Sequence, residues 1–216
     1  MVNLTDLGFS KNTIAETILS TYNKNSEPNA APMGATQEKE KQLMLKVFNS
    51  SSTLQNLKQN KAAVVNLTSD VTLFYRTTFK ETNPQGTLPP EWFQKAQTVN
   101  APRLLRADAT IEITIKDISP IDAQRTKVLC NAEHIDAKTA FPKAYCRAFG
   151  ATLDAIIHAT RVKAFAKDPN EQLKVAKLLE RIADCDDVVG RTAPNSQYAE
   201  IMRDLNQKIQ TWRAHP

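Results

Sequence analysis

The spacing of apolar residues changes near residue 141, and this change limits the folds that the chain can adopt. Before it, apolar and β-branched residues form short runs or alternate with polar residues, as at 107–118, which is typical of half-buried strands. After it, apolar residues recur at helical spacing, as Leu153, Ile156 and Ile157 do. Strands followed by helices predict an α+β protein and not a doubly wound parallel sheet.

Several segments of the first part have the composition of strands. They lie at 14–22, 28–34, 42–48, 62–67, 107–118 and 126–135. A polar turn at 23–27 separates the first two, and two prolines exclude a helix at 28–34. Polar residues at 37–41 predict another turn. A short helix is predicted at 54–58, whereas 71–79 is compatible with a helix or a strand.

Helices are predicted in the second part at 144–166, 171–184 and 196–212. We therefore predict a β domain at 1–143 and an α-helical subdomain at 144–216. Short isolated helices are marginal in water, so we expect their apolar faces to pack on the β domain or on a second subunit.

Charge and cysteine content narrow the class of protein. The net charge is +5, but the 28 lysines and arginines are spread among 23 acidic residues, with no basic block interleaved with aromatic residues. This pattern argues against a nucleic-acid partner and suits an anionic ligand. The three cysteines have no C-x-x-C spacing, which argues against a disulfide framework and fits a reducing compartment. No apolar run approaches the roughly 20 residues of a membrane span, so we expect a cytoplasmic protein without a membrane partner.

The sequence lacks the common catalytic motifs. It contains no G-x-S-x-G, no G-x-x-x-x-G-K-[ST], no G-x-G-x-x-G and no H-E-x-x-H. The histidines at 134, 158 and 215 are far apart, so we expect no metal site and assign no catalytic residue. If the protein is an enzyme, a cofactor is expected to carry the reactive group.

Four consecutive hydroxyl residues, 50–53, follow the predicted strand at 42–48 and precede the predicted short helix. Free backbone N–H groups, the positive end of the helix dipole and hydroxyl groups meet there, as in many phosphate sites. Lys46 or Lys58 could add a full charge. The alternative is that these residues only cap the helix.

A second candidate is the extended segment Asn29-Ala30-Ala31-Pro32-Met33-Gly34. Its small residues would let a flat ring lie against the backbone, whose amides and carbonyls can contact the ring edge. The alternative is an ordinary edge strand. The order of the two candidates matters, because one would hold a ring and the other its phosphate tail.

These two segments and three others occur in the order found in one protein family. The others are Glu16-Thr17-Ile18, the run from Ala63 to Asp70, and Pro102-Arg103-Leu104. The chain resembles the largely archaeal DUF447 family, whose members have the FMN-binding split-barrel fold of flavin-reductase-like proteins. Arg147-Ala148 and the run 157–161 resemble the helical region at the C-terminus of that family.

The resemblance implies a split β-barrel with a C-terminal helical region, and FMN bound near the interface of a homodimer. It implies cofactor-binding roles for Asn29, Ala30, Ala31, Met33, Gly34, Val65 and Asn66 at the ring, and for Ser51, Ser52, Thr53 and Asn56 at the phosphate and ribityl chain. Many relatives carry an arginine where Ser52 stands. We therefore expect phosphate binding here to be weaker, or to depend on Lys46, Lys58 or Arg103.

Two functions follow from the resemblance. The first is a flavin-dependent oxidoreductase or flavin reductase that takes electrons from NAD(P)H or another donor. The alternative is a non-catalytic flavin carrier or sensor, because the sequence has no recognisable nicotinamide-binding motif. Trp92 and Phe93 would cover a flavin face or simply anchor their loop.

Overall fold

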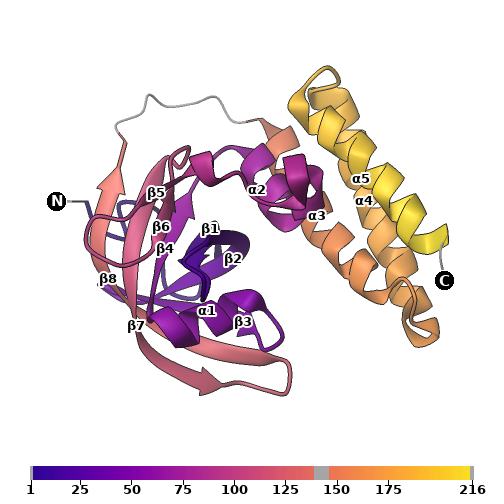
Figure 1. Ribbon diagram of the computed structural model, residues 1–216. Coiled ribbons are helices and arrows are strands. Elements are labelled where there is room, and N and C mark those ends of the chain that lie inside the picture. The colour runs from indigo at the N-terminus through magenta and orange to yellow at the C-terminus, as the bar shows by residue number, and fades with distance from the viewer. Residues whose placement is uncertain (1, 139–145, 215–216) are drawn as a thin grey trace. The chain divides into compact units, whose positions relative to one another are not determined.

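The computed structural model describes residues 2–138 and 146–214, and the chain divides into two compact units (Figure 1). The barrel unit comprises Met1–Thr68 and Phe79–Ala140, and the helical unit comprises Ser69–Thr78 and Phe141–Pro216. Within the described residues, no helix combines the length and the apolar character needed to cross a membrane.

The barrel unit is a closed antiparallel barrel with strand order β1-β2-β3-β8-β7-β4, in which β4 pairs with β1. Its strands are β1 (Ala15–Tyr22), β2 (Pro28–Lys39), β3 (Gln42–Phe48), β4 (Ala62–Leu67), β7 (Ala109–Pro120) and β8 (Arg125–Ala137). Two short strands, β5 (Phe93–Lys95) and β6 (Pro102–Leu104), form a separate two-stranded sheet. The predicted α+β class and the barrel are thus confirmed.

Alternating inward-facing residues fill the barrel. Leu19 pairs with Val65, and Val65 pairs with Ile111, so that three adjacent strands contribute neighbouring core side chains. All three side chains are buried in one cluster with Leu45 and Val128 from β3 and β8. Side chains that fill the interior are what a small barrel requires.

Strand β2 is longer than the sequence predicts. The polar residues at 37–41 predict a turn, but β2 continues to Lys39 through a shift of register between Gln37 and Lys39. The physical reason is exposure: Glu38 and Lys39 face solvent, so their polarity reflects the outside of a strand and not a turn.

Helix α1 (Ser52–Asn60) connects β3 to β4 across the barrel unit. It ends at Lys61, whose left-handed φ of 56° lets its N–H bond the Leu57 carbonyl. The predicted short helix at 54–58 is therefore real and two residues longer at each end. Three 3₁₀ turns follow later in this unit, η1 (Lys80–Thr82), η2 (Pro84–Gly86) and η3 (Pro90–Trp92).

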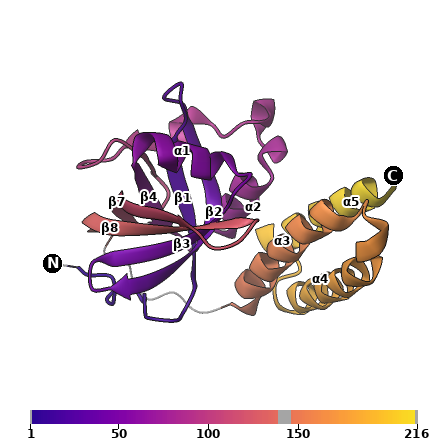
Figure 2. The same cartoon turned by 90° about the horizontal axis from the view of Figure 1, so that it is seen from below.

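The helical unit contains α2 (Val71–Thr78), α3 (Arg147–Phe165), η4 (Pro169–Glu171), α4 (Gln172–Thr192) and α5 (Gln197–Ala214). Helix α3 packs against both α4 and α5 (Figure 2). Buried side chains such as Ile156, Ile182 and Leu205 line the contacts inside this unit. The predicted helices at 144–166, 171–184 and 196–212 correspond to α3, α4 and α5, although α4 continues to Thr192 and residues 144 and 145 lie outside the described residues.

Helix α2 settles the ambiguity at 71–79, because the segment is helical and belongs to the helical unit. Tyr75 donates a hydrogen bond from its hydroxyl to Asp204 on α5, and Thr72 donates one to Gln197 at 3.2 Å. The contacts therefore assign α2 to the unit formed by the later helices. The division into domains at 1–143 and 144–216 stays a prediction. It does not provide for the segment Ser69–Thr78, which belongs to the helical unit but lies within the barrel unit in sequence.

Candidate functional site

A cavity of about 380 Å³ opens in the barrel unit, within the size range of small-molecule sites. The turn between β1 and β2, the start of α1 and the segment from Lys80 to Pro90 enclose it. Its lining consists of Asn23, Glu27, Pro28, Asn29, Ser52, Asn56, Lys80, Gly86, Thr87, Leu88 and Pro90. Three of the residues predicted from the sequence, Asn29, Ser52 and Asn56, thus meet in one place.

The start of α1 explains the roles of the hydroxyl residues. Ser51 caps the helix, since its Oγ accepts the Leu54 N–H at 3.2 Å and donates to the Phe48 carbonyl at 2.7 Å. Ser52 is the first helical residue and lines the cavity. The N–H groups of Ser52 and Thr53 have no acceptor within the helix, and the first turn carries no acidic residue. The positive end of the helix dipole is therefore available to an anion.

Asn56 and Thr53 lie on the buried side of α1. The Asn56 Nδ2 donates to the Thr21 hydroxyl on β1 at 2.9 Å, which ties the helix to the barrel wall. Thr53 is also buried, but it is not part of the cavity lining. Asn56 thus holds α1 against the barrel wall and also lines the cavity.

Lys80 is the cation of this cavity, and the sequence analysis did not identify it. Its Nζ donates a hydrogen bond to the Asn29 Oδ1. Within residues 2–138 and 146–214, Lys80 has no carboxylate partner. Burial lowers the pKa of the Lys80 ammonium. No local motif marks this residue, because only the fold brings the segment after α2 against the start of β2.

Glu27 is the acidic group of the cavity. The Asn23 Nδ2 donates to the Glu27 carboxylate at 2.7 Å, and the Asn23 Oδ1 accepts the N–H groups of Asn25 and Glu27. The Asn23 side chain therefore stabilises the turn between β1 and β2, and the polar composition of residues 23–27 predicts this turn. The cavity carries charges of both signs.

The segment from Pro28 to Gly34 has one paired and one open edge. It pairs with β1 along its whole length, for example Ala31 with Leu19. Pairing of β2 with β3 begins only at Ala35. On that side, the described residues supply no strand partner for 28–34, so the partly exposed residues of the segment can offer backbone groups to a ligand. Ala30 is excluded because it is fully buried, and the Met33 carbonyl already accepts a hydrogen bond from Thr17 at 2.6 Å.

The side chains of this segment differ in environment. Ala30 is fully buried, and Met33 packs against the barrel core. Gly34 is approached closely by Ile14, whose Cγ2 would lie 2.8 Å from a Cβ at that position. Ala30, Ala31, Met33 and Gly34 do not line the cavity, although they continue the strand from Asn29, which does.

Val65 and Asn66 lie in the barrel and not in the cavity lining. Val65 belongs to the core. The fully buried Asn66 Nδ2 lies within hydrogen-bond distance of the Ile18 carbonyl (2.8 Å) and the Ser20 hydroxyl (2.9 Å), and its Oδ1 accepts the Leu104 N–H at 2.9 Å. The Asn66 amide thus ties β6 to β4 and β1, and its polar atoms are already engaged.

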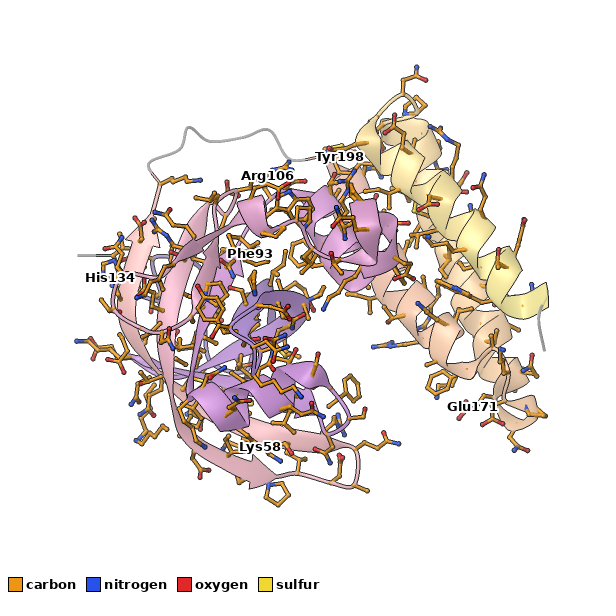
Figure 3. The ribbon with its side chains drawn as sticks, in the orientation of Figure 1. Lys58, Phe93, Arg106, His134, Glu171 and Tyr198 are labelled. Carbon is orange, nitrogen blue, oxygen red and sulfur yellow. The ribbon has the colours of Figure 1, made fainter. Side chains whose placement is uncertain are left out.

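The other basic candidates lie elsewhere. Lys46 and Lys58 are exposed and do not line the cavity (Figure 3 labels Lys58). Arg103 forms an ion pair with Asp136 at 2.7 Å. Trp92 and Phe93 are half-buried and also lie outside the lining, so nothing in the cavity distinguishes them from loop anchors.

A closed six-stranded antiparallel barrel with an open segment on one strand, followed by helices, defines a split-barrel protein. The family model described as "Protein of unknown function (DUF447) N-terminal domain" matches residues 15–139. The chain therefore belongs to the DUF447 family, as the sequence resemblance predicted. No curated protein sequence matches the chain.

Solved structures agree with this fold. The FMN-bound DUF447 protein MM1853 from Methanosarcina mazei is similar with a TM-score of 0.77 and 24% identity, over 94% of this chain and 98% of that one. Nitrilotriacetate monooxygenase component B from Bacillus cereus is similar with a TM-score of 0.51 and 14% identity, over 67% of this chain and 80% of that one. A putative flavin reductase with a split-barrel domain from Shewanella frigidimarina has a TM-score of 0.50 and 7% identity, over 58% and 67%.

Proposed function

We propose that the protein binds FMN noncovalently, with the phosphate in the cavity and the ring along the open edge of β2. One observation carries this proposal: Asn29, Ser52, Asn56 and Lys80, from three separate segments, line one cavity beside that open edge. The FMN named with the similar Methanosarcina mazei structure supports the same ligand.

The residues present fit the cofactor. A phosphate needs positive charge and hydrogen-bond donors, and Lys80, the Ser52 hydroxyl and the first N–H groups of α1 provide them. The Asn29 Nδ2 is buried without a hydrogen-bond partner in the described chain, so it is a further donor that a ligand would satisfy. The small and partly exposed residues Ala31 and Gly34 let a flat ring approach the backbone of β2.

When bound, FMN supplies hydride and electron transfer, and the protein orients the ring and shields it from water. We propose that the protein is an FMN-dependent oxidoreductase or flavin reductase with NAD(P)H or another reductant as donor. The function needs no dedicated acid–base pair from the chain, which agrees with the absence of known catalytic motifs from the sequence.

We also propose a cytoplasmic homodimer with the flavin near the subunit interface. The three cysteines are free thiols, as a reducing compartment favours. Ile14 and Phe48, both 62% exposed on the barrel unit, are large apolar side chains of the kind that a second subunit covers. Light scattering on purified protein measures the state directly, and a monomer at micromolar concentration would contradict this part.

The binding proposal is tested by titrating FMN against Ser52→Glu. A carboxylate in the first turn favours the helix but repels a phosphate, so the variant keeps its fold. We expect roughly a tenfold or greater loss of FMN affinity, followed by flavin fluorescence. Gln59→Glu, at the exposed far end of α1, is the matched control. Equal affinity of both variants and the wild type would refute the site.

Activity is tested by adding NADH or NADPH to the FMN-loaded protein under nitrogen. Bleaching of the flavin absorbance supports the oxidoreductase. A yellow colour that persists after either nicotinamide is added, as it does in a control without any reductant, supports the alternative, a non-catalytic flavin carrier or sensor.

A further inference from the structure

Among the residues that the structure describes, Lys80 has no carboxylate as an ion-pair partner. Lys80 lines the cavity, and its Nζ donates a hydrogen bond to the Asn29 Oδ1, a neutral acceptor. Half-buried ammonium groups are costly unless an opposite charge compensates them, and the described residues place no carboxylate within ion-pair distance of Lys80. Lys80 is therefore placed to receive an anionic ligand, although Glu27 lines another part of the same cavity.

Asn29 fixes the geometry around this cation. An ammonium group only donates hydrogen bonds, so the atom of Asn29 that faces Lys80 must be the carbonyl oxygen. The amide nitrogen then has a fixed place as well, and this buried Nδ2 has no partner in the described chain. One amide thus orients a charged donor and offers a second, neutral donor. Both are suited to the oxygens of a single phosphate.

The start of α1 completes the donor set but lacks charge. Ser52 is neutral, and the helix contributes only its partial dipole charge and first N–H groups. Lys80 is therefore the full positive charge among the cavity-lining residues. Lys58 and Lys46, the cations closest in sequence to this helix start, do not line the cavity.

We propose that Lys80, oriented by Asn29, binds the terminal phosphate of the flavin and so makes the site select FMN over riboflavin. This inference rests on the proposed function and deepens it, since it names the residue that distinguishes the phosphorylated cofactor from its dephosphorylated form. Lys80 is a specificity-determining residue and takes no part in the redox chemistry.

Glu27 provides a second, opposite test of the same arrangement. Glu27 lines the cavity, Asn23 donates a hydrogen bond to its carboxylate, and the negative charge would repel a phosphate bound there. Neutralising Glu27 should therefore tighten FMN and leave riboflavin unchanged, because riboflavin has no charge for the carboxylate to repel.

The experiment measures dissociation constants for FMN and riboflavin by flavin fluorescence and calorimetry. The variants are Lys80→Met, Lys80→Arg, Glu27→Gln and the control Lys58→Met, which removes the same charge from an exposed position. We expect Lys80→Met to weaken FMN roughly tenfold to a hundredfold and riboflavin by less than about twofold. Lys80→Arg should recover part of the FMN affinity, Glu27→Gln should raise it, and Lys58→Met should leave both flavins unchanged.

Several results would overturn the inference. Equal losses of FMN affinity in Lys80→Met and Lys58→Met would mean that only distant charge matters. Equal losses for both flavins in Lys80→Met would mean that Lys80 shapes the cavity without contacting the phosphate. Wild-type protein that binds both flavins equally would refute the inference and leave flavin binding intact, whereas protein that binds neither would refute the proposed function as well.

Discussion

Glu112→Gln should destabilise the barrel unit strongly, although the two side chains have nearly the same shape. Glu112 lies on β7 and is fully buried. Its Oε1 accepts the Gln97 N–H at 2.7 Å. Its Oε2 accepts the Thr98 N–H and hydroxyl, both at 2.6 Å, and the Val99 N–H at 3.3 Å. One carboxylate thus holds the loop between β5 and β6.

A glutamine can reproduce only one of the two oxygens. In its better orientation, the remaining oxygen keeps the bonds from Thr98 and Val99, and the new NH₂ group faces the Gln97 N–H, donor against donor. The variant loses one charge-assisted bond, about 1.5–3 kcal/mol, and leaves a buried N–H without an acceptor, about 1–3 kcal/mol. The expected loss in the free energy of unfolding is about 2.5–6 kcal/mol.

Urea unfolding followed by circular dichroism measures this loss, with the exposed Glu38→Gln as control. We expect the control to stay within about 0.5 kcal/mol of the wild type. A Glu112→Gln variant that loses less than about 1 kcal/mol would refute the reasoning, because it would mean that the loop finds equivalent bonds elsewhere.

The same carboxylate makes stability depend on pH. Burial alone would raise the pKa of Glu112, but the hydrogen bonds from Thr98, Gln97 and Val99 outweigh it and hold the pKa below its ordinary value. The stabilisation is therefore complete above the unfolded-state pKa of about 4.3 and is lost as the pH falls through the folded-state pKa. Wild-type stability should fall on acidification in that range, and Glu112→Gln should flatten the fall in urea titrations.

Three further substitutions test the local structure. Ser51→Ala should cost about 1 kcal/mol in thermal or urea unfolding, because it removes the cap of α1; no loss would mean that Ser52 replaces the cap. Asn66→Ala should cost about 2–4 kcal/mol, since it leaves the buried Leu104 N–H without its acceptor, and an unchanged urea midpoint would contradict this role. Gly34→Ala should cost less than about 1 kcal/mol, because the atom it meets is the Cγ2 of the 62% exposed Ile14, which can move. The double variant with Ile14→Ala should recover the difference, and a larger unrecovered cost would point to the backbone.

The barrel could be predicted from the sequence where local pattern and tertiary environment agree. The sequence predicts the strand at 62–67 with the bounds that β4 has, because a run of apolar residues suits a strand covered on both faces. At 71–79 the sequence pattern does not distinguish a helix from a strand, and the structure has the helix α2 there. The apolar side chains of α2 are buried against helices far along the chain, and the residues next to α2 in the sequence give no sign of these contacts.

The candidate site was only partly predictable, for a similar reason. Ser52 follows from the local rule that helix starts bind anions, and Asn56 follows from the family resemblance; the structure places both at the cavity. Asn66 illustrates the limit, since an asparagine in a strand has the same sequence signature whether it faces a ligand or bonds the backbone inside. Lys80 illustrates the converse, because a lysine outside any motif acquires its partner, Asn29, only through the fold.

Helix α2 lies between barrel strands in the sequence but belongs to the helical unit, and this determines how the two units can be separated. A fragment that begins at residue 146 would contain α3, α4 and α5 but would lack the helix whose Tyr75 hydroxyl bonds Asp204. During synthesis, α2 emerges well before these partners, while the barrel still lacks β7 and β8. A cut before residue 146 therefore leaves α2 on the fragment that contains the barrel, and an intact helical unit requires that α2 be joined to the later helices by design.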